Sequence, residues 1–220
     1  MPIIKTTVIR GFTDRPIQEE ITRAMADALM YSLGEVSRPW VYSLVEEVEP
    51  GQWYFSSFGD VMPDENTVAS GRAQIEEHRS KRLTRDRVLA AYAALGSGDQ
   101  EEINKYWAED MTWLVPGEAP ISGLKKGRDE FMAFMKQVGE LSDNSFNMDF
   151  KAVFTGGDPK VIGGDTSVDL SHNTGHRAGD ENRTLEIDVA HVLRWQDGQV
   201  VEGRGAIFGS GTSQYTEFWS

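Results

Sequence analysis

TLEIDVAHVLRW, residues 184–195, is followed by the turn QDG (196–198) and by QVVEGRGAIFG (199–209). The first run alternates apolar and polar side chains, the period of a strand with one buried face. The alternation places His191 on the same face as four apolar residues, Leu185, Ile187, Val189 and Leu193. The Asp-Gly turn predicts that the two runs form an antiparallel hairpin. A histidine on an apolar face needs a polar partner or a ligand, so the hairpin predicts a site as well as a sheet.

Helix and strand patterns precede this hairpin in a fixed order. Helical patterns occupy TRDRVLAAYAALGSG (84–98), DQEEINKYWAED (99–110) and GRDEFMAFMKQVGEL (127–141). Strand patterns occupy MTWLVPG (111–117), NMDFKAVF (147–154) and DTSVDLSH (165–172). Helices followed by a curved antiparallel sheet are an α+β arrangement, in which helices on one face of the sheet enclose a pocket.

The first sixty residues carry a separate β-α-β pattern. IIKTTVI (3–9) and WVYSLVEEV (40–48) are typical of strands, and a helix begins between them after Thr13 or Asp14, with Pro16 in its first turn. A unit this short cannot bury both faces of its sheet, so we expect a homo-oligomer. We predict a module over 1–62, a linker over 63–83 and a second domain over 84–220.

MPIIKTTVIRG, the helix and VYSLVEEVEPGQW together resemble the 4-oxalocrotonate tautomerase family. The resemblance implies that Pro2, once Met1 is removed, is a catalytic base or nucleophile. The alternative is that Pro2 only opens a strand, where proline is tolerated. Phe12 and Tyr42 stand where the family has substrate-binding arginines. With Trp53 they predict a pocket for an aromatic or apolar substrate.

Residues 85–209 are similar to the SnoaL-like polyketide cyclases and ketosteroid isomerases, which share the nuclear-transport-factor-2-like cone. The residues that carry the resemblance are AAYAALGSGD, WAEDMTW followed by VPG, GLKKGRDEF, and HVLRWQDGQVVEGRGAIFG. The resemblance implies that Tyr92 donates a hydrogen bond to a substrate oxyanion and that His191 acts beside it. We also predict that Trp113 and Val115 bind substrate.

The catalytic aspartate of the isomerases has no counterpart here, because its position is held by Val115. Steroid isomerisation by that aspartate is therefore excluded. The candidates for a replacement base are Glu186, Asp188, Asp169, His172 and His176. Because Glu186 and Asp188 alternate away from the apolar face, His191 itself is the preferred base.

The amino-acid composition excludes or disfavours several classes of function. The net charge of −13 disfavours nucleic acid and anionic membranes as partners, and the absence of cysteine excludes disulfides and thiolate chemistry. The four histidines form no cluster at metal-ligand spacing on a predicted helix. No apolar run approaches the roughly 20 residues of a membrane span. We expect a cytoplasmic protein that needs no metal or cofactor.

These observations favour a small-molecule enzyme that acts on an enolisable carbonyl, as an isomerase, cyclase or dehydratase of aromatic or polyketide-like substrates. Tyr92 and His191 would act in the second domain and Pro2 in the first. The alternative is a non-catalytic protein that binds hydrophobic ligands or serves assembly, with a decayed tautomerase module.

Overall fold

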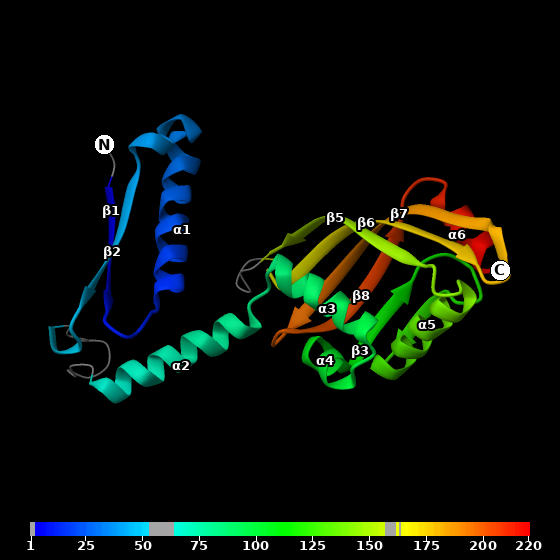
Figure 1. Cartoon of the computed structure of the whole chain (residues 1–220), viewed down its shortest axis with the longest axis horizontal. Coiled ribbons are helices and arrows are strands. Elements are labelled where there is room, and N and C mark those ends of the chain that lie inside the picture. The colour runs from blue at the N-terminus through cyan, green and yellow to red at the C-terminus, as the bar shows by residue number, and fades with distance from the viewer. Residues whose placement is uncertain (1–2, 53–63, 157–161, 163) are drawn as a thin grey trace. The chain divides into compact units, whose positions relative to one another are not determined.

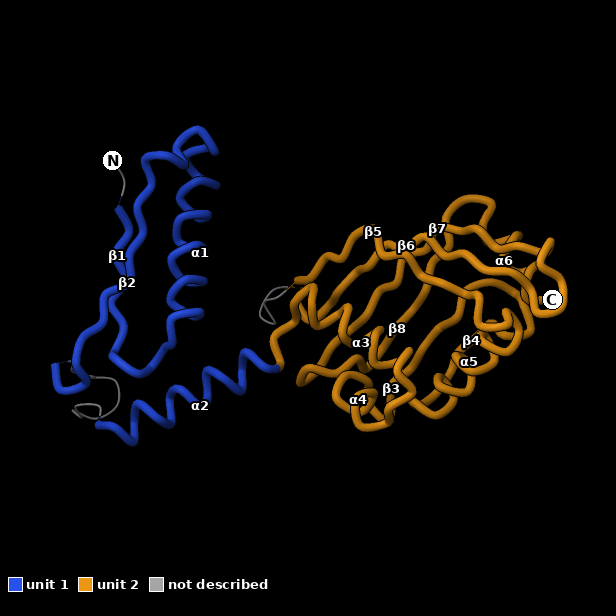
Figure 2. Tube along the Cα trace, viewed as in Figure 1, with its two compact units in different colours: residues 1–80 blue, residues 81–220 orange. Residues whose placement is uncertain are grey.

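The structure, a computed structural model, describes residues 3–52, 64–156, 162 and 164–220. The chain divides into two compact units, residues 1–80 and 81–220 (Figure 2). Pro2 and Trp53, two of the predicted site residues, lie outside the described residues.

Unit 1 is built on the β-α-β pattern. Strands β1 (Ile3–Ile9) and β2 (Tyr42–Val48) pair in parallel and are joined by helix α1 (Arg15–Leu33), which packs on β2. Asp14 begins α1, since its carboxylate accepts a hydrogen bond from Ile17 N at 3.0 Å. Two short 3₁₀ turns complete the connections, η1 (Glu35–Trp40) and η2 (Pro50–Gln52).

Residues predicted to be a linker form a long helix, α2 (Glu65–Lys81). Asp64 caps it by accepting from Thr67 N at 2.8 Å. The ring of Phe12 lies against Gly71 of α2 so closely that a Cβ there would sit 2.4 Å from Phe12 Cζ. The structure therefore places Phe12 in the packing between the β1–α1 turn and α2.

Unit 2 packs helices on a six-stranded sheet (Figure 1). Its helices are α3 (Arg85–Ser97), α4 (Gln100–Tyr106), α5 (Arg128–Leu141) and α6 (Gly211–Trp219). Its strands are β3 (Trp107–Val115), β4 (Gly123–Lys126), β5 (Asn147–Thr155), β6 (Thr166–Arg177), β7 (Asp180–Gln196) and β8 (Gln199–Ile207).

The sheet runs in the order β4-β3-β8-β7-β6-β5. The prediction of an antiparallel sheet is wrong for one pair of strands, because β3 and β8 pair in parallel. The other neighbouring strands are antiparallel. The predicted β7–β8 hairpin is present, and both Asp197 (φ 49°) and Gly198 (φ 82°) have the positive φ values that a type I′ turn requires.

The second predicted helix ends early. α4 stops at Tyr106, and residues 107–110, expected to be helical, begin β3. Trp107 is fully buried at this point and its Nε1 donates to Ala91 O of α3 at 2.9 Å. Burial of this indole against α3 outweighs the helical pattern of the local sequence.

The core of unit 2 is an aromatic cluster around Trp107. The Trp107 ring lies 5.2 Å from Phe131 of α5 and 6.1 Å from Trp113, measured between ring centroids. Trp113 passes directly over Gly203 of β8, where a Cβ would lie 2.2 Å from the indole. Because Gly203 has no side chain, the Trp113 indole has room to lie against the sheet at this point.

Within the described residues, none of the helices is both long and apolar enough to cross a membrane.

Candidate active site

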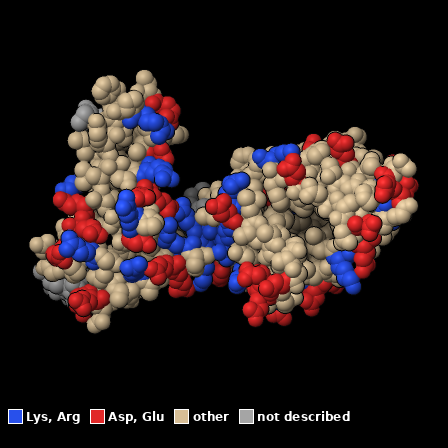
Figure 3. Space-filling model, in the orientation of Figure 1, with Lys and Arg blue, Asp and Glu red and all other residues tan. Residues whose placement is uncertain are grey.

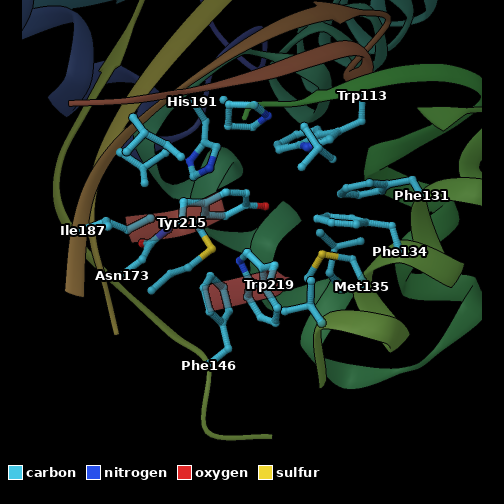
Figure 4. Close-up of a pocket in the computed structure, with 18 of the residues that line it drawn as sticks. Trp113, Phe131, Phe134, Met135, Phe146, Asn173, Ile187, His191, Tyr215 and Trp219 are labelled. Carbon is cyan, nitrogen blue, oxygen red and sulfur yellow. The ribbon is translucent and has the colours of Figure 1, made fainter. Parts of the chain in front are cut away.

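Unit 2 holds a cavity between the sheet and helices α3, α5 and α6 (Figure 4). It comprises about 640 Å³ of unfilled space, counted to include its opening to solvent. Apolar and aromatic side chains make up most of its wall, among them Leu95, Trp113, Val115, Phe131, Phe134, Met135, Phe146, Ile187 and Val189. The polar lining residues are Tyr92, Asn173, His191 and Tyr215, with Trp219. Cavities lined mainly by apolar side chains with a few polar groups are the usual sites for small molecules.

Two buried side chains, Asp169 and His191, and the partly buried Tyr92 form one hydrogen-bonded chain at this cavity. Tyr92 Oη lies 2.8 Å from Asp169 Oδ2, and His191 Nδ1 lies 2.9 Å from Asp169 Oδ1. Asp169 is completely buried and His191 is 7% exposed. A carboxylate only accepts hydrogen bonds, so both Tyr92 and His191 donate to it. The neutral imidazole therefore carries its proton on Nδ1 and presents an unprotonated Nε2.

Strand pairing brings Asp169 to His191. The two residues are direct partners in the β6–β7 register, so their side chains project from the same face of the sheet. That face of β6 is polar: Ser167, Asp169, Ser171 and Asn173 are buried. From the sequence, Asp169 was only one of five candidate bases. The spacing of polar residues at 167, 169, 171 and 173 was the signal that could have singled it out.

The hydroxyl of Tyr92 donates a hydrogen bond to Asp169 and so orients the carboxylate. The expected donation from Tyr92 to a substrate oxyanion stays a prediction. Burial, followed by the Asp169 charge and hydrogen bond, raises the pKa of Tyr92 well above its usual value and keeps the phenol neutral.

Tyr215 of α6 is a donor that the sequence did not reveal. Its ring reaches into the cavity with the hydroxyl oxygen leading (Figure 4), and it is 7% exposed. Among the described residues, its hydroxyl has no hydrogen-bond partner. Burial raises the pKa of Tyr215, so it stays a neutral donor. The sequence showed an aromatic C-terminal segment but not which surface that segment covers.

The raised pKa values of Tyr92 and Tyr215 lead us to expect that the folded protein loses stability at alkaline pH. In the unfolded chain both phenols titrate near pH 10, whereas burial raises the pKa of each in the folded protein. Stability is therefore complete below about pH 10 and falls above it, by about 1.4 kcal/mol per pH unit for each tyrosine. Urea unfolding measured at successive pH values should show this slope, and Tyr215→Phe should make it shallower. An unchanged slope in Tyr215→Phe would contradict the assignment.

The other predicted site residues divide between the units. Trp113 and Val115 line the cavity beside His191, and the Trp113 ring centroid is 5.6 Å from that of the imidazole. Tyr42 lies on β2 of unit 1 with 51% of its surface exposed. Two further candidate bases lie outside the cavity, since His172 Nδ1 pairs with Asp188 Oδ1 at 2.9 Å on a more exposed face of the sheet.

A groove leads toward the cavity between α3, α5 and β5. It shares Tyr92, Met135 and Phe146 with the cavity wall and adds Met132 and Phe150. Figure 3 shows this part of unit 2 as a hollow with few charged side chains in it. Methionine side chains adapt to ligands of varied shape, which suits an entrance for an apolar molecule.

The described residues contain no group of three His, Asp or Glu side chains arranged to hold a metal ion. The polar groups of the cavity are instead suited to donate, accept and transfer protons.

Known proteins match part of this chain. An uncharacterised protein of Mycobacterium tuberculosis (strain H37Rv) is 27% identical over 77 residues, which make up 35% of this chain and 59% of that protein. The chain thus spans about three fifths of the length of the curated relatives it matches. Bal32a, from a soil-derived mobile gene cassette, has a TM-score of 0.53 at 25% identity, over 66% of this chain and 99% of Bal32a.

An NTF2-like protein of unknown function from Burkholderia pseudomallei has a TM-score of 0.50 at 19% identity, over 61% of this chain and 95% of that one. This likeness shows the NTF2-like fold of unit 2. The family model described as SnoaL-like domain matches residues 88–203. Because that match spans more than half of the 220 residues, the chain belongs to the SnoaL-like domain family.

Proposed function

We propose that the protein is an enzyme of the isomerase or cyclase type that moves a proton next to a carbonyl group, with His191 as the acid–base residue. The observation that carries the proposal is the hydrogen bonding of the imidazole. Asp169, completely buried, holds Nδ1, while Nε2 has no hydrogen-bond partner among the described residues of a cavity that His191 lines. A base held in one tautomer in a largely apolar site is suited to proton abstraction.

The proposed step begins with a ketone in the cavity. His191 Nε2 takes a proton from the carbon next to the carbonyl, and the electron pair of that C–H bond forms a carbon–carbon double bond. The carbonyl π electrons move to oxygen, which becomes an enolate oxygen and accepts a hydrogen bond from Tyr215. The imidazolium then returns the proton to the same or another carbon. A donor to such an oxygen in a dry site is worth about 3–4 kcal/mol.

The lining favours an aromatic or polyketide-like substrate. Trp113 and Phe131 stack with ring centroids 4.8 Å apart along one wall, and Phe134 continues the row 6.2 Å from Phe131. Flat ring systems can bury apolar surface against such a wall, and contacts with the edges of its rings add to that gain.

Exchange of α-protons tests the proposal without knowledge of the natural substrate. 2-Tetralone is an enolisable bicyclic ketone, and its α-proton exchange in D₂O can be followed by proton NMR. We expect wild-type protein to accelerate exchange and His191→Gln to lower that acceleration by about 10²- to 10⁴-fold. Saturable binding of 2-tetralone with no accelerated exchange would favour the alternative, a protein that only binds hydrophobic ligands.

Pro2→Ala is the matched variant for unit 1. The resemblance of this unit to the tautomerases assigns a separate amine base to Pro2, and we keep that role as a proposal. Exchange that survives His191→Gln and is lost in Pro2→Ala would locate the chemistry in unit 1 and contradict the role of His191.

We also propose that unit 1 mediates self-association. Its parallel sheet has only two strands among the described residues, and Ile3, Tyr42 and Leu44 on one face are 59%, 51% and 42% exposed. Parallel sheets are normally covered on both faces. Sedimentation velocity should give a multiple of the 24.6 kDa chain mass, and Leu44→Lys should lower it. A wild-type monomer would contradict this proposal.

A further inference from the structure

One part of the cavity carries buried polar atoms that the described part of the chain leaves unpaired. Asn173 of β6 and Trp219 of α6 both line the cavity and are 3% and 2% exposed. Among the described residues, neither Asn173 Oδ1 nor Trp219 Nε1 has a hydrogen-bond partner. Buried polar atoms are nearly always paired, because an unpaired one costs free energy. Two such atoms, one acceptor and one donor, point to a common ligand group.

The surroundings of Trp219 fix its indole. Ring centroids of Phe218, Tyr215 and Phe146 lie 4.6, 6.0 and 6.1 Å from that of Trp219. The guanidinium carbon of Arg177 lies 6.0 Å from the ring centroid. The phenylalanine rings offer no strong acceptor and the guanidinium only donates. The Tyr215 hydroxyl can accept but makes no hydrogen bond to Nε1.

The unpaired atoms lie away from the acid–base residue. Asn173 follows Asp169 by four residues on the same inward face of β6, a separation of about 13 Å along an extended strand. Asn173 pairs with Ile187 in the register, whereas Asp169 pairs with His191. Figure 4 shows His191 on one side of the cavity and Trp219 on the opposite side.

We propose that Asn173 and Trp219 form a second polar subsite that binds a hydroxyl group of the ligand. The hydroxyl donates to Asn173 Oδ1 and accepts from Trp219 Nε1, so one group satisfies both atoms. A carboxylate cannot do this, since it has no proton to donate. Resting on the proposed function, this subsite defines the substrate as an elongated, mostly apolar ring system with an enolisable carbonyl near His191 and a hydroxyl at its far end.

A pair of ligands of equal shape tests the subsite. 2,6-Dihydroxynaphthalene and 6-methyl-2-naphthol share one hydroxyl and differ only in whether the far substituent is a hydroxyl or a methyl group. Isothermal titration calorimetry on the full chain should show that wild type prefers the dihydroxy compound by about three- to tenfold. Asn173→Leu should remove or reverse this preference, because a methyl group is then the better match for the apolar site.

Two further variants complete the test. Trp219→Phe keeps a ring and removes Nε1, so it should also abolish the preference, and it replaces Asn173→Leu as the test if that variant does not fold. His191→Gln should keep the preference within about twofold, since it alters the other side of the cavity. A preference unchanged in both Asn173→Leu and Trp219→Phe would overturn the subsite, and so would a preference lost only in His191→Gln. These binding measurements do not depend on turnover, so a failure of 2-tetralone exchange would contradict the proposed function and not the subsite.

Discussion

Asp169→Asn is expected to lower the α-proton exchange of 2-tetralone by about 10²- to 10⁴-fold while leaving the fold intact. The carboxylate accepts a hydrogen bond from His191 Nδ1 at 2.9 Å and so keeps the proton off Nε2. An asparagine amide that turns its NH₂ group toward Nδ1 makes that nitrogen an acceptor and moves the imidazole proton to Nε2. The base then becomes a donor, without any change in the shape of the cavity.

A merely structural role for Asp169 would not change the tautomer of His191. ¹⁵N NMR of the histidine nitrogens should therefore show a protonated Nδ1 in wild type and a protonated Nε2 in Asp169→Asn. Asp188→Asn is the matched control, because Asp188 also pairs with a histidine, His172, at 2.9 Å but outside the cavity. Equal losses of exchange in the two variants would contradict the assignment of Asp169 as a positioning residue.

Trp107→Ala is expected to destabilise unit 2 by about 3–5 kcal/mol, a large share of the roughly 5–15 kcal/mol that holds a typical domain folded. Trp107 is fully buried, contacts the Phe131 ring and donates to Ala91 O. Its ring also lies edge-on to Tyr92 at 6.0 Å. Loss of the indole therefore leaves a cavity in the core and releases α3, which carries the first member of the Tyr92–Asp169–His191 chain.

Urea denaturation of two variants should separate the cost of the core cavity from the cost of losing the hydrogen bond to Ala91 O. Trp107→Phe retains a ring and removes the donor to Ala91 O, so it should cost less than Trp107→Ala. Phe208→Ala removes an aromatic residue that is 54% exposed and should change the free energy of unfolding by at most about 0.5 kcal/mol. If Trp107→Ala cost no more than Phe208→Ala, the aromatic cluster would not be the core of unit 2.

The sequence carried enough information to predict the SnoaL-like, NTF2-like fold of unit 2. Local signals encode the β7–β8 hairpin: alternation sets the inward face, and Asp197 and Gly198 adopt the turn their residue types favour. The same alternation correctly predicted that His191 lies on the apolar face. The parallel pairing of β3 with β8 was not predictable in this way, because it joins segments about ninety residues apart and no local pattern records it.

Tertiary contacts also explain what the sequence did not reveal about the site. Tyr92 and Asp169 are 77 residues apart, and only the packing of α3 over the sheet brings the phenol to the carboxylate. Tyr215 and Trp219 line the cavity because α6 packs on β7, a placement the sequence of a short terminal helix does not specify. The tautomerase resemblance of residues 1–62 stays a prediction.

The most direct test of the role of His191 is ¹⁵N NMR of its imidazole with 2-naphthol, a planar aromatic analogue of the enol of 2-tetralone. We expect saturating 2-naphthol to shift the Nε2 resonance of His191 while Nδ1 stays protonated. A Nε2 resonance unchanged on saturation would contradict the claim that this nitrogen faces the ligand and carries the chemistry.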